Sequence, residues 1–347
     1  MTVNVLIVDD SATLREVVRH HLEAQPQIRV VGTAADPIEA REAIKRLNPD
    51  VITLDIEMPR MNGLEFLRRL MQLRPMPVVM VSSLTGPSTK MAVQAMELGA
   101  VDCFGKPASL SDDTGFEGLS QAVLSAARAD VGRFPLTRPV AAADPLPGNS
   151  YEPGRRVITI GSSTGGVEAL FTLLRQFPVN CPPTFITQHI PSHFSESFAR
   201  RLDSHCAPRI AEARDGMEVR PGMVVIAPGG SHHLKIGRGL TCRLREGPKV
   251  SGHRPSVDAL FDSALPYGKR IVAGLLTGMG RDGADGLLRL RKSGAYTVAQ
   301  DEETSVVFGM PRAAIEQGAA IKVAPLTRIA PILLNAPVGA RSTGIGA

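Results

Sequence analysis

Residues 157–170 read VITIGSSTGGVEAL: an apolar run, a turn rich in glycine and serine, and then an amphipathic segment. This order predicts a buried strand that leads through a tight turn into a helix. Gly161 to Gly165 have the G-x-S-x-G spacing, whose glycines let the turn be sharp and leave the hydroxyl of Ser163 exposed. The same turn also fits a phosphate loop, although it lacks the GK[ST] of a P-loop. The stretch predicts an α/β fold with Ser163 as a candidate nucleophile.

A nucleophilic serine needs a base placed within reach of its hydroxyl. Of the eight histidines, His189 alone follows an apolar strand, PTFITQH at 183–189. Strand ends in a parallel sheet share one edge, so His189 would project beside Ser163. The other histidines fall in expected helices or turns, where a solvated side chain is the usual state; they are His20, His21, His193, His205, His232, His233 and His253.

The acid that orients this histidine should come from a third strand end. The stretch IVAGLLTGMGRDGADGL at 271–287 is a strand, a glycine-rich loop and a helix, and it places Asp282 in the loop. Asp282 also fits an ordinary helix N-cap, and Asp285 is a competitor that falls inside the helix. Ser163, His189 and Asp282 are therefore the candidate triad.

The same loop supports a rival interpretation. Gly278, Gly280 and Gly283 give G-x-G-x-x-G after a strand, and Asp301 ends the next strand 18 residues beyond Gly283. This imitates the fingerprint of a dinucleotide-binding enzyme. Against it, Asp282 would bring negative charge to a pyrophosphate, and the Ser163 turn and His189 would stay without a role.

Further from this stretch, strands and helices alternate on both sides of a region rich in proline and alanine, TRPVAAADPLPGNSYEPG at 137–154. Alternation predicts parallel α/β domains, and the region between them predicts a linker. We expect domains at 1–110 and 154–335, a linker at 111–153 containing a weak helix near 119–129, and a disordered tail at 336–347.

The first domain has acidic residues at its strand ends. Asp9 and Asp10 follow the first strand and Asp55 ends the third, so the three carboxylates should meet at one edge. Such a cluster is self-repelling unless a hard cation such as Mg²⁺ sits in it. Ser82 and Lys106 end two further strands on that edge and could bind phosphoryl oxygens.

The composition limits the class of protein. The chain is 43% hydrophobic and 21% charged, and no apolar run approaches the ~20 residues that span a bilayer. Without a signal peptide, we expect a cytoplasmic protein that is not inserted in a membrane.

The four cysteines lack metal or redox spacing. Residues 151–347 carry 24 Lys and Arg against 16 Asp and Glu, an excess of 8 that favours an acidic protein partner over nucleic acid because no DNA-reading motif accompanies it.

The first domain resembles the receiver domains of two-component signalling in its VDDSA at 8–12, LDIEMPRMNG at 54–63, VSS at 81–83 and FGKP at 104–107. The resemblance implies a flavodoxin-like parallel sheet in which Asp55 takes a phosphoryl group from a histidine kinase. It further implies Mg²⁺ bound by Asp10 and Asp55 with help from Asp9 and the carbonyl of Glu57. Phosphate sensing would fall to the residues Ser82, Lys106 and Phe104, with Pro107 after a cis peptide bond.

The second domain resembles the CheB family of chemotaxis methylesterases. The motifs are IGSSTGGVEAL at 160–170, ITQHIPSHFSESFARRL at 186–202, GHRPSVDALF at 252–261 and LLTGMGRDGADGL at 275–287. The resemblance implies a doubly wound α/β domain that hydrolyses glutamate methyl esters on methyl-accepting chemoreceptors, and in many members deamidates receptor glutamines. Ser163 would be the nucleophile, His189 the base, Asp282 its partner, and the Met279 amide part of an oxyanion hole, with no cofactor for hydrolysis.

The two-domain order implies regulation: an unphosphorylated receiver would cover the triad, and phosphorylation of Asp55 would weaken that packing. A non-enzymatic alternative is a receiver that gates a module for receptor binding only. The identity of the receptors, the extent of deamidation and the choice between flagellar chemotaxis and another methylated system stay open at this stage.

Overall fold

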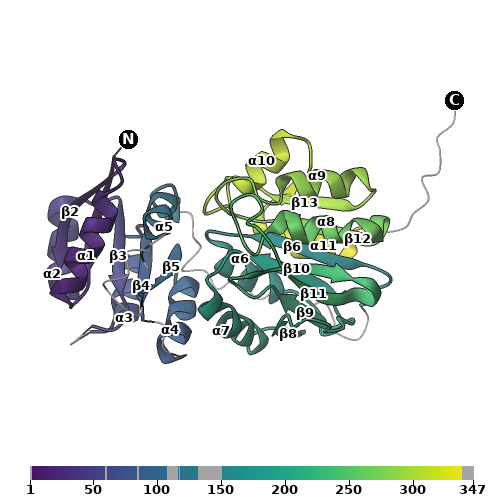
Figure 1. The fold of residues 1–347 in the computed structure, drawn as a ribbon, viewed down its shortest axis with the longest axis horizontal. Coiled ribbons are helices and arrows are strands. Elements are labelled where there is room, and N and C mark those ends of the chain that lie inside the picture. Colours follow the sequence, from purple (N-terminus) through teal and green to yellow (C-terminus); the bar gives the residue numbers. More distant parts are fainter. Residues whose placement is uncertain are drawn as a thin grey trace. The chain divides into compact units, whose positions relative to one another are not determined.

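The chain forms two compact units, Met1–Val140 and Ala141–Ala347. We describe them from a computed structural model, shown as a ribbon in Figure 1. It describes residues 2–58, 61–83, 86–107, 116, 118–131 and 151–337. Most of the expected linker and residues 338–347 of the expected tail lie outside this range. Within it, no helix is both long and apolar enough to cross a membrane.

The first unit is a five-stranded parallel sheet in the order β2-β1-β3-β4-β5, with helices between the strands. This is the receiver architecture that the sequence predicts. The strands are β1 (Val3–Val8), β2 (Ile28–Ala34), β3 (Val51–Asp55), β4 (Val78–Ser82) and β5 (Asp102–Gly105). The helices are α1 (Ala12–Glu23), α2 (Pro37–Leu47), α3 (Gly63–Leu73), α4 (Gly86–Glu97) and α5 (Leu119–Ala126).

Polar residues at the strand ends start the helices and fix where the loops turn. Ser11, Asp36 and Asn62 are the N-caps of α1, α2 and α3, and their side chains accept hydrogen bonds from first-turn amides. Every residue of β3 and β4 is buried, and the last residue of each strand, Asp55 and Ser82, is polar. The sheet therefore gathers its reactive side chains at one edge.

The helix α5 lies within the stretch that the sequence analysis assigned to the linker. It packs against β4 and β5, with Phe116, Leu119 and Val123 buried. The sequence signal there was weak because α5 is only eight residues long. The receiver core thus extends beyond residue 110 into this helix.

The second unit contains a seven-stranded parallel sheet in the order β14-β13-β12-β6-β7-β9-β8, and an antiparallel pair, β10 and β11. The sheet strands are β6 (Val157–Ser162), β7 (Thr184–Gln188), β8 (Arg209–Glu212), β9 (Met223–Ile226), β12 (Ile271–Leu275), β13 (Tyr296–Gln300) and β14 (Lys322–Ala324). The pair is β10 (His232–Gly237) and β11 (Thr241–Glu246). The helices are α6 (Gly166–Leu174), α7 (Ser192–Asp203), α8 (Val257–Ala264), α9 (Ala284–Lys292), α10 (Met310–Glu316) and α11 (Leu326–Asn335), with short 3₁₀ turns η3 (Arg238–Leu240) and η4 (Leu265–Arg270).

Helices cover both faces of this sheet. Gly274 of β12 faces Leu333 of α11, whereas Gly161 of β6 faces Val257 of α8. Gly274 pairs with Ile160 and not with Gly161, so the two glycines point to opposite faces. The prediction of a doubly wound α/β domain is confirmed.

The strand order places the catalytic candidates. The strand β6 is central, with β7 on one side and β12 on the other, so the chain winds outward in both directions from it. In such sheets the crevice at the carboxyl ends, where the order reverses, is the usual ligand site. The loops after β6, β7 and β12 meet there, and they carry Ser163, His189 and Asp282.

The antiparallel pair was not expected from the sequence. His232 and His233, which we expected in a turn, begin β10. The pair β10–β11 packs through β10 on α8 and buries Leu234 and Cys242 in the core. Its strands read HHLKIG and TCRLRE, and because polar and charged residues interrupt both, neither stood out as an apolar run.

The contact between Gly161 and Val257 is tight enough to test. A Cβ on Gly161 would lie 2.1 Å from Val257 Cγ1, so Gly161→Ala should lower the free energy of unfolding by about 1–3 kcal/mol. The double variant Gly161→Ala/Val257→Ala should lose less than the sum of the single variants, because removing the valine methyls makes room. Urea unfolding of all four chains measures this coupling.

Gly247→Ala is the control for that experiment. Its Cβ would make an ordinary contact of 3.7 Å with His233, so we expect little change in stability. Strictly additive effects of the Gly161 and Val257 substitutions would contradict the packing argument.

Candidate active site

The acidic pocket of the first unit is built at the ends of β1, β3 and β5. Carboxylate oxygens of Asp9, Asp10 and Asp55 lie within 4.8 Å of one another. Lys106 Nζ lies 2.9 Å from Asp9 Oδ2 and 2.8 Å from Asp55 Oδ2. The three carboxylates and the lysine meet as the sequence predicts.

The residues of this pocket fit a Mg²⁺ ion. Asp9 and Asp55 are buried, and Asp55 Oδ1 is buried without a hydrogen-bond partner in the described residues. A buried oxygen of this kind is costly unless a cation or donor reaches it. The donors are all oxygen atoms, which Mg²⁺ prefers.

The remaining receiver candidates lie around this cluster. The hydroxyl of Ser82 donates to the carbonyl of Ser83, and the ring of Phe104 stacks on Phe116 at 6.1 Å between centroids. The Glu57 carboxylate accepts hydrogen bonds from the hydroxyls of Ser83 and Ser88. Ser82 ends β4 and Phe104 lies in β5, which puts both on strands next to the pocket.

Two features of the backbone shape the loops of this pocket: a glycine before α3 and the peptide bond before Pro107. A Cβ on Gly63 would lie 2.0 Å from the carbonyl oxygen of Asp55, so the turn before α3 can press against β3 only with glycine there. Across the described part of the chain the only cis peptide bond is Arg254–Pro255. Our expectation of a cis bond at Lys106–Pro107 is therefore wrong, and the bond keeps the trans form that most X–Pro bonds prefer.

Burial and neighbouring charges shift the pocket's acid–base equilibria. Burial raises the pKa of Asp55 from 3.8 to about 6, with Asp9 adding to the rise and Lys106 opposing it. For Lys106, burial disfavours the charge, but the two carboxylates outweigh it and raise its pKa. The pocket thus holds an excess of negative charge that a cation would relieve.

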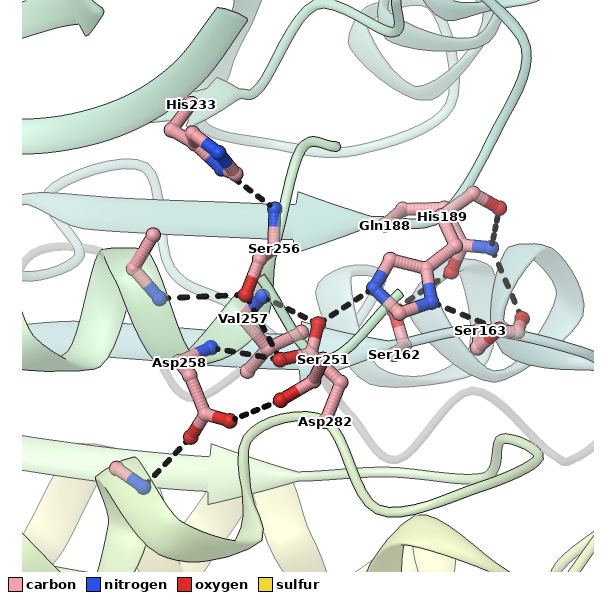
Figure 2. A network of polar contacts seen from close by, with 12 residues as sticks. Ser162, Ser163, Gln188, His189, His233, Ser251, Ser256, Val257, Asp258 and Asp282 are labelled. Carbon is pink, nitrogen blue, oxygen red and sulfur yellow. Dashed lines mark hydrogen bonds and ion pairs between the residues drawn. The ribbon is translucent and has the colours of Figure 1, made fainter. Parts of the chain in front are cut away.

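In the second unit, Ser163, His189 and Asp282 form one hydrogen-bonded line. His189 Nδ1 lies 3.1 Å from Ser163 Oγ, and His189 Nε2 lies 2.8 Å from Asp282 Oδ2. Figure 2 shows the imidazole between the other two side chains. Since a carboxylate can only accept, Nε2 carries the proton and Nδ1 keeps a lone pair for the serine hydroxyl. This is the geometry of a nucleophile and its base.

The carboxylate of Asp282 is held at the start of α8 (Figure 2). Its Oδ1 accepts from Ser256 Oγ at 2.8 Å and from the Asp258 amide at 3.1 Å, and its Oδ2 accepts from the Val257 amide at 2.8 Å. Asp282 is 1% exposed. Burial alone would raise its pKa, but the hydrogen bonds from His189 and these amides outweigh burial and lower it. Asp282 therefore stays ionised beside the imidazole.

The N-cap alternative for Asp282 does not hold for its own helix. The residue before α9 is Gly283, and α9 has no side-chain cap. Asp285 lies inside α9, where it forms an ion pair with Arg281 at 2.9 Å on the surface. Of the two acids, the structure brings only Asp282 to the histidine.

The first and last glycines of the rival dinucleotide motif, Gly278 and Gly283, pack against protein atoms. A Cβ on Gly278 would lie 2.7 Å from Ser163 Cβ and 2.3 Å from Met310 Sδ. The carbonyl of Gly278 accepts from the amides of Gly309 and Met310. The loop is thus closed by the Ser163 turn and the start of α10, which explains its glycine without a nucleotide.

Gln188 ties the two catalytic loops together. Its Nε2 donates to the carbonyls of Ser163 and His189, both at 2.9 Å, and its Oε1 accepts from Ser162 Oγ at 2.6 Å. Because Gln188 is buried, these bonds hold the backbone at the candidate nucleophile, Ser163, and at the candidate base, His189. Gln188, the last residue of β7, therefore helps to set the spacing between them.

Comparison with known proteins agrees with this geometry. Residues 158–333 match the CheB methylesterase family, and residues 5–112 match the response regulator receiver domain. The chain belongs to the CheB methylesterase family. A protein-glutamate methylesterase/protein-glutamine glutaminase of Agrobacterium fabrum is 53% identical over 95% of both chains.

Two further relatives support the assignment to the CheB family. A protein of the same description from Caulobacter vibrioides is 52% identical over 96% of this chain and 97% of its own. The crystal structure of the Thermotoga maritima CheB methylesterase catalytic domain is 40% identical, with a TM-score of 0.50, and covers 52% of this chain and 97% of that one. The similarity therefore extends over both units in sequence and over the second unit in structure.

Three residues that contact the candidate triad were missed by the sequence reasoning: Gln188, Ser256 and His253. Gln188 had one visible signal, because it is a polar residue at the buried end of an apolar strand. Ser256 stands in the quoted motif GHRPSVDALF and caps α8. His253 stands in the same motif, but we expected a solvated side chain, whereas it stacks on His189.

The raised pKa of Asp55 predicts a pH-dependent instability. Without divalent cations, Asp55→Asn should raise the free energy of unfolding of the first unit by about 1–3 kcal/mol at pH 7. The folded state binds this proton more tightly than the unfolded state, so the penalty is absent below about pH 4, grows as the pH rises towards about 6, and then stays constant. Urea unfolding in a chelator at pH 7 and pH 4 measures it.

Mg²⁺ provides the control for this experiment. It should stabilise the original chain at pH 7 more than Asp55→Asn, because the variant lacks one carboxylate of the cluster. If Asp55→Asn gained as much stability at pH 4 as at pH 7, the substitution would be acting through packing, contrary to the charge argument.

Proposed function

We propose that this chain is a protein-glutamate methylesterase activated by phosphorylation, which hydrolyses glutamate methyl esters on methyl-accepting chemoreceptors in chemotaxis adaptation. The observation that carries the proposal is the line from Ser163 through His189 to Asp282. Its support from relatives is the activity named for the similar proteins of Agrobacterium fabrum and Caulobacter vibrioides.

The hydrolysis proceeds by acyl transfer. Ser163 Oγ attacks the ester carbonyl carbon while His189 Nδ1 takes its proton. The tetrahedral intermediate collapses, the bond to the methoxy oxygen breaks, and Nδ1 returns the proton to give methanol. Water then attacks the acyl-enzyme through the same base, which releases glutamate and restores Ser163. Asp282 stabilises the imidazolium that forms twice in this cycle, and no cofactor takes part.

The oxyanion needs donors close to Ser163. The amide of Met279 is our candidate, because Met279 follows Gly278 and that glycine packs directly against the Ser163 side chain. A preorganised amide at the developing charge supplies much of the rate in enzymes of this class. The same site should accept a glutamine amide, with ammonia leaving in place of methanol.

The first unit would regulate the hydrolysis through phosphorylation. A histidine kinase would transfer a phosphoryl group to Asp55, with Mg²⁺ held by Asp9, Asp10, Asp55 and the carbonyl of Glu57. When bound, the ion would neutralise charge on the phosphoryl oxygens. Lys106 and Ser82 would contact those oxygens, and Phe104 would reorient with them. The excess of positive charge in residues 151–347 would favour docking on a carboxylate-rich receptor.

Substitution of the triad separates an esterase from a module that only binds receptors. Ser163→Ala should abolish methanol release from methylated receptor while receptor binding is kept, and Asp282→Asn should lower the rate by about 10³- to 10⁴-fold because the imidazole loses its orienting charge. Methanol release and receptor co-sedimentation are measured in parallel. Asp285→Asn is the matched control, since Asp285 lies on the surface of α9. Full methanol release by Ser163→Ala would exclude the proposed mechanism.

The regulatory proposal predicts an inhibited resting state. The full chain without a phosphodonor should release methanol at least about 10-fold more slowly than the same chain with one, or than residues 150–347 alone. Asp55→Asn should stay at the slow rate with or without the phosphodonor. If residues 150–347 alone were no faster than the unphosphorylated chain, the receiver would not act as a cover.

A further inference from the structure

A second imidazole lies flat against the catalytic one. The ring centroids of His253 and His189 are 3.8 Å apart, and the ring planes differ by 10°. His253 is half-buried, and its ring is parallel to His189 while the hydrogen bonds of His189 leave from the ring edge. The two sets of contacts therefore act in different directions on the same ring.

The loop that carries His253 is tightly held. The backbones of Val250 and His253 exchange two hydrogen bonds, 3.0 and 2.9 Å long. Next to it, Arg254 donates to the carbonyls of Gly230 and Gly247. A loop held by this many hydrogen bonds presents its side chains in a fixed direction.

Buried His233 fastens both ends of this loop. Its Nε2 lies 2.9 Å from the Pro248 carbonyl. Its Nδ1 accepts from the Ser256 amide at 3.1 Å, the contact that Figure 2 draws. Ser256 in turn donates to Asp282. One segment, 250–258, thus contacts the face of the base and also holds the acid.

We propose that His253 is a positioning residue for the hydrolysis, which holds the His189 ring in the plane where it meets both Ser163 and Asp282 and keeps water from that face. The inference rests on the proposed function. The two hydrogen bonds of His189 lie in the plane of its ring, so neither of them supports the face of the ring. Contact with a flat ring on one face limits the out-of-plane motion that rotation of the His189 side chain would otherwise allow.

The electrostatics of the stack fit this role. The pKa of His253 is lowered to about 4: burial is the largest cause, the charges of His189 and Lys249 add to it, and Asp282 opposes them. His253 is therefore neutral when His189 becomes an imidazolium during the reaction. A neutral aromatic ring can face that cation without repulsion.

The kinetic test compares two substitutions of His253 in the full, phosphorylated chain. His253→Ala should lower kcat for methanol release by about 5- to 20-fold with KM changed by less than about 3-fold, because the catalytic ring can tilt and hydrate. His253→Phe should stay within about 3-fold of the original, because it keeps a flat neutral ring. His205→Ala is the control, since His205 is exposed at the end of α7.

A spectroscopic test needs no substrate. The proton between His189 Nε2 and Asp282 should give a low-field proton resonance, which is identified by its loss in Asp282→Asn. In His253→Ala this resonance should broaden through faster exchange with water, and His253→Phe should restore it. Thermal unfolding of each variant shows whether it is folded.

The outcomes are distinct. An unchanged kcat and an unchanged resonance in His253→Ala, or a His253→Phe variant as impaired as His253→Ala, would overturn the positioning role. If the original chain released no more methanol than Ser163→Ala, the proposed function would fail, and the resonance would still test the stacking.

Discussion

A buried carboxylate at the start of a helix is the interaction on which the catalytic unit depends. Asp282 accepts hydrogen bonds from His189, Ser256, Val257 and Asp258. A buried charge without such partners would cost several kcal/mol, so the carboxylate and the start of α8 each fix the other's position. Because α8 packs on β6 through Gly161, the position of Asp282 is linked to the strand that ends beside Ser163.

The receiver pocket uses a buried carboxylate in the opposite way. Asp55 has a buried oxygen without a partner in the described residues, and its pKa is raised, whereas the pKa of Asp282 is lowered. A fully satisfied carboxylate is suited to hold a neighbour still. An incompletely satisfied one gains from a cation or from chemical modification. The two units thus place the same functional group at strand ends and differ in how completely they satisfy it.

The site residues that could be predicted from the sequence are those at the ends of strands. Asp9, Asp55, Ser163 and His189 each stand at or just after an apolar strand, and parallel sheets bring such positions together. Asp282 lies several residues beyond β12, so its placement needed the family motif. Ser256 and His253 could not be predicted, because their roles depend on a loop whose shape comes from His233 and Arg254, far from any periodic pattern. The strands β8 and β14 were missed because they are short, and β10 and β11 because charged and polar residues interrupt their apolar pattern.

The orientation of the imidazole follows from the order of the strands. His189 ends β7, and its neighbour β6 carries Ser163, whereas Asp282 follows β12, one strand further away. Neighbouring strands are about 4.8 Å apart. The near nitrogen, Nδ1, meets the serine next door, and the far nitrogen, Nε2, extends to the acid two strands away. Which nitrogen faces Ser163 thus depends on the distance between the strands, and a sheet that placed the aspartate beside the histidine and the serine two strands away would exchange the partners of the two nitrogens.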